Sequence, residues 1–283
     1  MTGVLYVVAT PIGNLDDMSQ RARTVLQQVS LIAAEDTRHS ARLLQHFDIG
    51  THCQALHDHN EQLQIDGLLA RLAAGESIAL ISDAGTPLIS DPGYRLVAAA
   101  QAAGMAVSPV PGACAAVAAL SAAGLPSDRF VFEGFLAAKS AARRSRLEAL
   151  AAEPRTLMFY EAPHRIVECL RDMTEILGPE RRITLARELT KTFETIRQLP
   201  AAQMLAWVES DTNQQRGEIV LVVEGAPESN REAGDVEADV MLGRLLKYLP
   251  VKQAAQLAAE LTGRRKNELY DRALVLQRNL QSE

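Results

Sequence analysis

Short apolar runs alternate with amphipathic segments in the first half of the chain. The runs expected to form strands are residues 4–9, 31–34, 78–81 and 107–110. The segments with apolar residues at helical spacing are 20–28, 62–74 and 94–103, and Ser19 precedes the first of them as a candidate N-cap. An uninterrupted apolar run is typical of a strand buried on both faces, as in a parallel sheet. The pattern therefore predicts an α/β domain, which we assign to residues 1–122.

The second half of the chain is expected to contain more strand. Its apolar runs are residues 130–135, 156–160, 182–186 and 217–224. The sequence Gly-Leu-Pro-Ser-Asp at 124–128 interrupts the earlier alternation and marks a domain boundary. We therefore expect an α+β domain at residues 123–226.

The last part of the chain is expected to be helical. A polar linker at 226–235 precedes three segments with helical patterns, at 236–248, 251–261 and 268–279. We therefore assign a small helical extension to residues 235–283.

Small and turn-forming residues follow the apolar run at 78–81. The loop reads Ser82-Asp83-Ala84-Gly85-Thr86-Pro87, and open α/β sheets bind ligands at the carboxyl ends of their strands. Without bulky side chains the backbone can approach a ligand closely, and Asp83 offers an acceptor for an amino or hydroxyl group. Neither a Walker lysine nor a G-x-G-x-x-G follows, so the loop suits an uncharged or cationic cofactor better than a phosphate. An ordinary turn explains one such loop, but comparable loops recur at Pro11 and Pro111.

Dense polar clusters follow two of the expected strands. Residues 35–40 read Glu-Asp-Thr-Arg-His-Ser, and residues 161–165 read Glu-Ala-Pro-His-Arg. Acid, cation and imidazole groups together at a strand end favour a functional site over an ordinary solvated face. His57 and His59 have no obvious third ligand, and helix capping by Asp58 or Asn60 explains that segment better, so no metal site is expected.

The composition is that of a globular protein with a sizeable core. The chain has 283 residues, of which 47% are hydrophobic and 23% charged. No apolar run approaches the roughly 18 residues of a membrane span, and the N-terminus leads directly into a strand. We therefore expect a cytoplasmic protein that contacts no membrane. Cys53, Cys114 and Cys169 are far apart, which indicates neither a disulfide framework nor a zinc site.

Two basic clusters are candidates for binding nucleic acid, although the formal net charge of −6 argues against wholesale wrapping. The first comprises Lys139, Arg143, Arg144 and Arg146. No acidic residue follows it before Glu148, so it is interpreted as an unneutralised patch for phosphates, with a solvated face as the alternative. The second comprises Arg264, Arg265 and Lys266. It follows a Gly-containing turn as in a helix-turn-helix that touches RNA, but packing on the main body explains the same pattern.

Taken together, these segments resemble a known family, the S-adenosylmethionine-dependent methyltransferases with the tetrapyrrole-methylase fold. The similar segments are VATPIGNL (8–15), LIAAEDTRHS (31–40), LHDHNE (56–61), SDAGTPLISDPGY (82–94), PVPGACAA (109–116), ALSAAGLPSDRF (119–130), YEAPHR (160–165), LARELTKTFET (185–195) and GEIVLVVEG (217–225). They cover almost all of both domains, and together they are specific although each alone is weak. The tail, with KNELY at 266–270, also looks like an extension found in this family.

The resemblance implies a cofactor site in a cleft between the two domains. The contacts that it implies for S-adenosylmethionine are Pro11, Ser82, Asp83, Ala84, Gly85, Thr86, Cys114, Ala115, Tyr160, Glu161 and Ala186. The central loop departs from the Gly-Gly-Asp-Pro that tetrapyrrole enzymes of this fold carry, so the loop is better supported than its individual contacts.

The resemblance also implies a substrate. The members that this chain resembles most methylate a cytidine ribose 2′-hydroxyl in small-subunit ribosomal RNA. The resemblance therefore implies that the partner is this RNA or the assembled small subunit. It also implies that the protein is a homodimer. Two alternatives are a methylase acting on a tetrapyrrole and a non-catalytic RNA-binding factor for ribosome assembly.

Methyl transfer to a hydroxyl requires the oxygen to be aligned with an activated methyl group. A protonated ribose hydroxyl is a poor nucleophile, so a general base or a cation is expected near the methyl group. The first candidates are Glu161 with Lys191, and the second are Asp36 with Arg38. An ion pair between Glu161 and Lys191 that only braces the domains explains the first pair equally well. His164 and Arg165 are further candidates for holding RNA phosphates.

Overall fold

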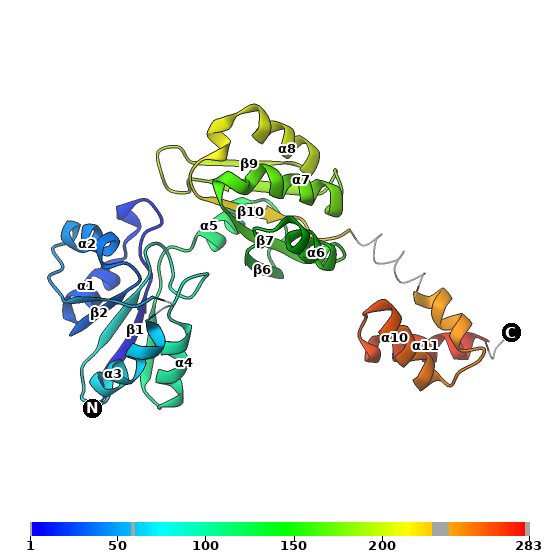
Figure 1. Cartoon of the computed structure of the whole chain (residues 1–283), viewed down its shortest axis with the longest axis horizontal. Helices are drawn as coiled ribbons and strands as arrows, with labels where there is room; N and C mark the ends of the chain where they lie inside the picture. Colours follow the sequence, from blue (N-terminus) through cyan, green and yellow to red (C-terminus); the bar gives the residue numbers. More distant parts are fainter. Residues whose placement is uncertain (1, 58–59, 228–237, 281–283) are drawn as a thin grey trace. The chain divides into compact units, whose positions relative to one another are not determined.

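The computed structural model describes residues 2–57, 60–227 and 238–280. The chain forms two compact units, of which the larger comprises residues 1–150 with 155–224 and the smaller residues 151–154 with 225–283. The larger unit contains two five-stranded sheets with helices packed against them (Figure 1). The first sheet is parallel and the second is mixed, so the predicted fold class is confirmed.

The first sheet is built from the apolar runs of the first half of the chain. Its strands are β1 (Val4–Val8), β2 (Leu31–Ala34), β3 (Cys53–Ala55), β4 (Ile78–Ile81) and β5 (Ala106–Val110). They lie in the order β3-β2-β4-β1-β5, and every pair is parallel. All residues of β2 and β4 are buried, as the apolar runs predict. Because the strands are parallel, the loops that follow β1, β2 and β4 meet at one edge of the sheet.

Helices cover both faces of the first sheet. On one face α1 (Gln20–Gln28) and α2 (Thr37–His46) pack on the sheet through a core that includes Leu26 and Leu44. On the other face α3 (Glu61–Ala73) and α4 (Tyr94–Ala102) pack through residues such as Leu68 and Leu96. The sheet is therefore buried between two layers of helix.

The helix starts of this domain were only partly predicted from the sequence. Ser19 caps α1 as predicted, and its hydroxyl accepts the N–H of Ala22 at 3.1 Å. The polar residues 35–40 do not form a loop cluster, because Asp36 caps α2 and the helix begins at Thr37. Asn60 precedes α3 without a side-chain capping bond, while Asp58 and His59 lie outside the described residues.

The second sheet is mixed. Its strands are β6 (Phe130–Phe135), β7 (Thr156–Glu161), β8 (Arg182–Arg187), β9 (Thr195–Pro200) and β10 (Ile219–Val223). They lie in the order β6-β7-β10-β8-β9, in which β6 and β7 are parallel and the other pairs antiparallel. The strand β9 was not predicted, because only its two ends are partly buried and its middle residues are exposed.

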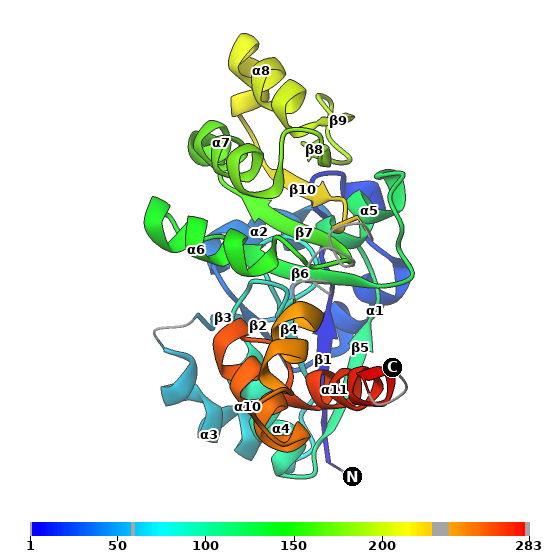
Figure 2. The same cartoon turned by 90° about the vertical axis from the view of Figure 1, so that its right-hand side faces the viewer.

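Helices also flank the second sheet. The helix α5 (Ala115–Ala122) packs on β7, β8 and β10 through Ala116 and Ala119, whose small side chains let the helix approach the sheet closely. The helices α6 (Ser140–Leu150), α7 (Ile166–Leu177) and α8 (Ala201–Ser210) pack in succession, away from α5 (Figure 2). Short 3-10 helices are found at η1 (Leu15–Asp17), η2 (Pro163–Arg165) and η3 (Thr212–Gln215).

The smaller unit is helical, as predicted for the tail. It contains a helix at residues 238–245, then α10 (Val251–Thr262) and α11 (Lys266–Leu280). Leu242, Ala255 and Leu269 belong to its buried core. Gly263 ends α10 with φ 67°, a left-handed conformation that favours glycine. The expected linker at 226–235 lies mostly outside the described residues.

Arg143 is a core residue, which corrects its assignment to a phosphate-binding patch. Its side chain is 2% exposed, and its Nε donates to Oδ2 of Asp172 on α7 at 2.6 Å. Burial alone would raise the pKa of Asp172, but the hydrogen bonds from Arg143 and Arg144 hold it below its usual range. The pair fastens α6 to α7 and is inaccessible to a nucleic acid.

The neighbouring arginines are more exposed but neutralised. Arg144 forms an ion pair with Glu175 at 2.6 Å, and Arg146 makes two hydrogen bonds to Glu133 at 2.7 and 2.8 Å. The interpretation of an unneutralised patch is therefore wrong, because the carboxylates come from β6 and α7 rather than from nearby sequence. Lys139 is exposed and makes no ion pair within the part of the chain that the structure describes.

Candidate functional site

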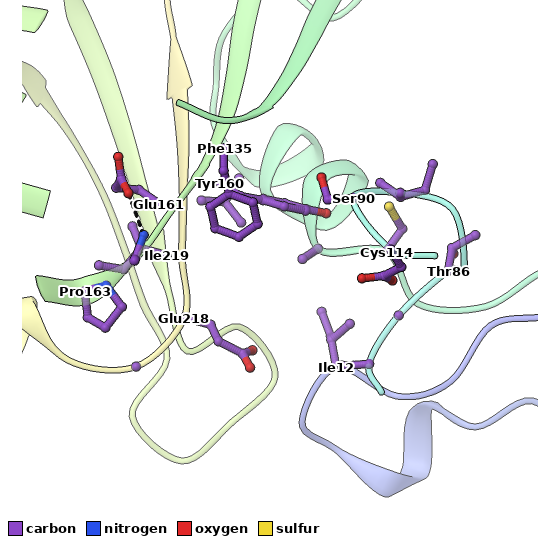
Figure 3. A pocket seen from close by; sticks show the side chains of 18 residues that line it. Ile12, Thr86, Ser90, Cys114, Phe135, Tyr160, Glu161, Pro163, Glu218 and Ile219 are labelled. Atoms are coloured by element: carbon purple, nitrogen blue, oxygen red, sulfur yellow. Dashed lines mark hydrogen bonds between the residues drawn. The ribbon is translucent and has the colours of Figure 1, made fainter. Parts of the chain in front are cut away.

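A cavity of about 360 Å³ opens at the carboxyl edge of the first sheet, within the larger unit. We call it the first cavity. Its walls come from the loops after β1 and β4, the start of α5, and strands β6, β7 and β10 of the second sheet (Figure 3). Its size is in the usual range for small-molecule sites, and both sheets contribute to it.

The loop after β4 is held in a fixed shape. Leu88 and Ser90 have φ of 73° and 70°, a left-handed conformation that costs energy in residues with a Cβ. Gly85 exchanges two backbone hydrogen bonds with Thr10, at 2.9 and 3.1 Å. The hydroxyl of Thr86 donates to the carbonyl of Ala113 at 2.9 Å. The loop is thereby joined to the two neighbouring loops that line the cavity.

Tyr160 forms the side of the first cavity that belongs to the second sheet. Its hydroxyl accepts the N–H of Ala116 at 3.2 Å, and its ring packs edge to face against Phe135 with centroids 5.5 Å apart. Burial raises the pKa of Tyr160 above its usual range, so the hydroxyl stays protonated at neutral pH. Together with Ile12 and Val220, these rings make the cavity largely apolar.

Asp91 is a partly buried carboxylate in the first cavity. Burial raises the pKa of Asp91, and the hydrogen bond with Ser82 only partly offsets this effect. A positively charged ligand would stabilise the ionised form. Aromatic and apolar walls, small loop residues and the carboxylates of Asp91 and Glu218 fit a ligand that combines a flat ring with hydroxyl groups and a positive charge.

A second cavity of about 290 Å³ adjoins the first. Ile12, Ala84 and Glu218 line both cavities. In Figure 3 the carboxylate of Glu218 points toward Ile12. A molecule in the second cavity therefore lies next to one end of the first.

Lys191 lines the second cavity from a tightly bonded loop after β8. Its Nζ donates to Glu188 at 2.8 Å and to Glu218 at 3.1 Å. Glu188 and Thr190 have φ of 50° and 65°, so the backbone is strained on the N-terminal side of the lysine. Its stem lies against Gly13, where an added Cβ would lie 2.4 Å from Cγ of Lys191. Burial alone would lower the pKa of Lys191, but the hydrogen bonds to Glu188 and Glu218 raise it, so the side chain is charged.

Most residues expected to contact a cofactor line one of these cavities. Those in the first cavity are Ala84, Gly85, Thr86, Cys114, Ala115, Tyr160 and Glu161. Those in the second are Pro11, Ser82, Asp83 and again Ala84. Ala186 lines neither cavity: its side chain is fully buried in the core beneath α5, paired with Val220, which does line the first cavity, so its contact with a cofactor stays a prediction.

Glu161 is not paired with Lys191, so the expected ion pair between them is wrong. The side chain of Glu161 is 1% exposed, and its Oε1 accepts the N–H of Ala162 at 2.7 Å and Nε of Arg165 at 2.8 Å. In Figure 3 it points away from Ile12. These contacts join the end of β7 to η2, so we interpret Glu161 as a brace and not as the general base.

Replacing Glu161 with glutamine is expected to destabilise the protein by about 2 kcal/mol, because a buried charge-assisted hydrogen bond to Arg165 is lost. Urea unfolding measures this change. Glu209→Gln removes the partner of Arg171 in an exposed pair and is the matched control, for which less than about 1 kcal/mol is expected. A hundredfold slower methyl transfer at unchanged stability would contradict this interpretation and restore Glu161 as the base.

Asp36 and Arg38 pair with each other outside both cavities. Asp36 caps α2 by accepting the N–H of Arg38 at 2.8 Å, and the two side chains are 3.1 Å apart. The hydrogen bond from the Arg38 side chain lowers the pKa of Asp36 to about 2, which makes it a poor base at neutral pH. The Asp36 N–H donates to Asp83, so the pair supports the cavity wall from behind.

The residues expected to bind RNA lie in several places. His164 is exposed on η2, whereas Arg165 is held by Glu161. In the smaller unit Arg264 pairs with Glu268, Lys266 donates to Gln256 at 3.1 Å, and Arg265 is exposed.

Neither a metal site nor a membrane span is found among the described residues. These residues contain no cluster of acidic, histidine and cysteine side chains able to hold a metal ion. Within the same residues, every helix is too short or too polar to cross a lipid bilayer.

Sequence reasoning missed Asp91, Phe135 and Glu218 in the first cavity and Arg42 in the second. Asp91 belongs to the motif SDAGTPLISDPGY. It was not predicted as a site residue because it lies ten residues after the end of β4. Phe135 is the last residue of β6, and Glu218 directly precedes β10. Both lie in segments that were interpreted only as strands. No local pattern distinguishes them, because they reach the cavity only through the pairing of β6, β7 and β10.

Comparison with known proteins extends over nearly the whole chain. Residues 4–205 match the family described as Tetrapyrrole (Corrin/Porphyrin) Methylases, and residues 232–277 match the RsmI C-terminal HTH domain. The chain is 64% identical over 274 residues to the ribosomal RNA small subunit methyltransferase I of Pseudomonas aeruginosa, covering 96% of this chain and 97% of that protein.

Solved structures share the fold at low identity. The methyltransferase CobJ has a TM-score of 0.59 at 21% identity and covers 80% of this chain and 95% of its own. The uroporphyrin-III C-methyltransferase of Thermus thermophilus, complexed with S-adenyl homocysteine, has a TM-score of 0.54 at 16% identity, with 78% and 97% covered. At these identities the likeness establishes the fold alone.

Proposed function

Because this chain belongs to the tetrapyrrole (corrin/porphyrin) methylases, we propose that it transfers a methyl group from S-adenosylmethionine to the ribose 2′-hydroxyl of a cytidine in small-subunit ribosomal RNA. The observation that carries this proposal is the near full-length, 64% identical match to a protein named for methylating that RNA. Two adjoining cavities, one for a methyl donor and one for an acceptor, support it.

The first cavity fits S-adenosylmethionine by the chemistry of its walls. Tyr160 and Phe135 offer faces and edges for an adenine ring, and the carboxylate of Asp91 suits a positive charge or a hydroxyl group. Gly85 keeps the loop close, because a Cβ there would lie 3.3 Å from Ile12. When bound, the cofactor supplies a methyl group already activated by its positively charged sulfur.

Glu218 lies where the two cavities meet, and together with Lys191 it positions the acceptor and receives its proton. Glu218 lines both cavities and accepts a hydrogen bond from Lys191. We assign Glu218 the role of accepting the proton of the ribose 2′-hydroxyl, and Lys191 that of stabilising negative charge on the same oxygen. Lys191 keeps the role expected from the sequence, with a different partner.

The substrate is ribosomal RNA, free or within the assembled small subunit. On the same family resemblance we propose a homodimer located in the cytoplasm. Two other functions are outcomes of the test below. The first is a tetrapyrrole methylase, which the shared fold alone does not distinguish from an RNA methylase. A non-catalytic assembly factor would bind the cofactor without turnover.

The deciding experiment is transfer of labelled methyl from S-adenosylmethionine to three acceptors: unmodified small-subunit ribosomal RNA, small ribosomal subunits and uroporphyrinogen. We expect label in RNA or subunits, and nuclease digestion with mass spectrometry should give 2′-O-methylcytidine. Label in the tetrapyrrole alone, or on a base instead of a ribose, would contradict the proposal. Binding of cofactor without transfer to any acceptor would support the assembly factor.

Replacing Arg264, Arg265 and Lys266 together with alanine is expected to weaken RNA binding. Each cation that contacts a phosphate releases about one counterion, so the slope of log affinity against log salt should fall by up to about three units. Filter binding over a range of KCl concentrations measures the slope.

The matched control replaces Arg71, Arg129 and Arg171 with alanine. These residues lie in the larger unit and line neither cavity. Because three positive charges are removed in both variants, the net charge changes equally. It should leave the slope unchanged. Equal slopes for the tail variant and the wild type would show that the smaller unit only packs and does not dock RNA.

A further inference from the structure

We propose that the second cavity binds the acceptor nucleotide, and that Arg42 and His39 on α2 hold its phosphate. The inference rests on the proposed function and names the site where the RNA enters. It differs from the basic clusters recognised in the sequence, none of which lines this cavity.

Arg42 and His39 lie on the wall that α2 contributes to the second cavity. They are three residues apart on a helix, so both side chains project from the same face. Both are exposed, and within the described part of the chain neither side chain makes a hydrogen bond or an ion pair. Arg38 and Arg165, by contrast, pair with Asp36 and Glu161. Arg42 therefore has its donors available for an anion.

Ser40, between these two residues, provides an independent indication of a ligand. It lines the second cavity and is 2% exposed, yet its Oγ has no hydrogen-bond partner among the described residues. A buried hydroxyl without a partner is uncommon in folded proteins, because losing its bonds to water costs about 1–3 kcal/mol. A ligand oxygen in the cavity would satisfy it.

Another part of the wall of the second cavity keeps a lysine in place. Lys191 is held by Glu188 and Glu218, and its stem lies against Gly13. Its loop carries backbone strain at Glu188 and Thr190. Strain of this kind persists only where the surrounding structure enforces it, and it is concentrated at functional sites. The lining of the second cavity therefore includes Lys191 as well as Arg42 and His39.

The position of the cavity limits what its ligand is. Ile12, Ala84 and Glu218 are shared with the first cavity, so the ligand's reacting atom lies beside the methyl donor. In RNA the 2′-hydroxyl and the 3′-phosphate are on neighbouring carbon atoms of one ribose. A phosphate held by Arg42 and His39 would therefore leave the 2′-oxygen near Glu218. Arginine also suits this contact, because its planar guanidinium can donate two parallel hydrogen bonds to one phosphate.

The test compares Arg42→Ala and His39→Ala with the wild type in binding small-subunit ribosomal RNA transcribed in vitro, with S-adenosylhomocysteine present to prevent turnover. For Arg42→Ala we expect about tenfold weaker binding, and a slope of log affinity against log KCl that is smaller by about 0.7 to 0.9, the loss of one phosphate contact. Arg42→Lys should keep the slope and recover part of the affinity, because it keeps the charge without the planar donors.

Two further measurements separate this site from general effects. Affinity for S-adenosylmethionine, measured by calorimetry, should be unchanged in Arg42→Ala, which also shows that the fold is intact. Arg171→Ala removes an exposed arginine that lines neither cavity, and should bind RNA as the wild type does.

The outcomes distinguish this proposal from the proposed function. If the wild type methylates the RNA but Arg42→Ala binds it with unchanged affinity and slope, this site is wrong and the function stands. If the wild type neither binds nor methylates the RNA, both are wrong. A loss in Arg171→Ala equal to that in Arg42→Ala would also overturn the site, since the effect would then be one of net charge.

Discussion

Replacing Thr86 with arginine is expected to lower the affinity for S-adenosylmethionine by at least about a hundredfold. Thr86 lines the first cavity, and its hydroxyl donates to the carbonyl of Ala113. An arginine side chain would occupy space that the ligand needs and would place a positive charge where the ligand carries its own. Calorimetric titration measures the affinity directly.

Thr86→Ser is the matched control for this change. It keeps the hydroxyl and its bond to Ala113 while removing one methyl group, so its affinity should stay within a few-fold of the wild type. The thermal unfolding temperature of both variants shows whether the loop is still folded. A folded Thr86→Arg variant that binds the cofactor as the wild type does would show that the first cavity is not its site.

Replacing Glu218 with glutamine is expected to lower the rate of single-turnover methyl transfer by about a hundredfold. A positioned acid or base contributes typically a hundredfold to ten-thousandfold, and glutamine keeps the shape of the side chain without accepting a proton. The side chain is 71% exposed in the absence of RNA, so the bound nucleotide would cover it. Rapid-quench measurement with labelled S-adenosylmethionine gives the rate of the chemical step.

Lys191→Met tests the second half of this pair. Loss of the charge next to Glu218 should slow the same step by about tenfold to a hundredfold, while affinity for S-adenosylmethionine stays near that of the wild type. Glu188→Gln is the control, because it removes the other carboxylate that holds Lys191 but leaves the lysine bonded to Glu218. If Glu218→Gln transfers the methyl group at a rate within a few-fold of the wild type, Glu218 is excluded as the general base.

The loop after β4 was found from its sequence because its signal is local. An apolar run and the small residues that follow it are adjacent in the chain, and the edge at which such a loop lies follows from strand direction. The resemblance to a family added Tyr160 and Cys114, which also line the first cavity. Ala186 shares a face of the second sheet with its cross-strand partner Val220, but α5 covers its side chain, so only Val220 lines the cavity.

Charged residues were harder to interpret because their partners are distant in the chain. Arg143 meets Asp172, 29 residues away, and Lys191 meets Glu218, 27 residues away. Residues 134–147 contain no acid, which is why the cluster was interpreted as a free basic surface. Free and neutralised arginines look alike in a sequence.

The sequence by itself determined four of the five strands of the first sheet, the loops at its carboxyl edge, the family and the helical tail. Each of these depends on neighbouring residues, because burial on both faces requires an unbroken apolar run and a tight loop requires small residues. Only the tertiary structure decided which charges are free and which are paired, and that Glu218 and Arg42 lie at the cavities. Those properties depend on strands and helices that pack together from distant parts of the chain, and no local pattern records that packing.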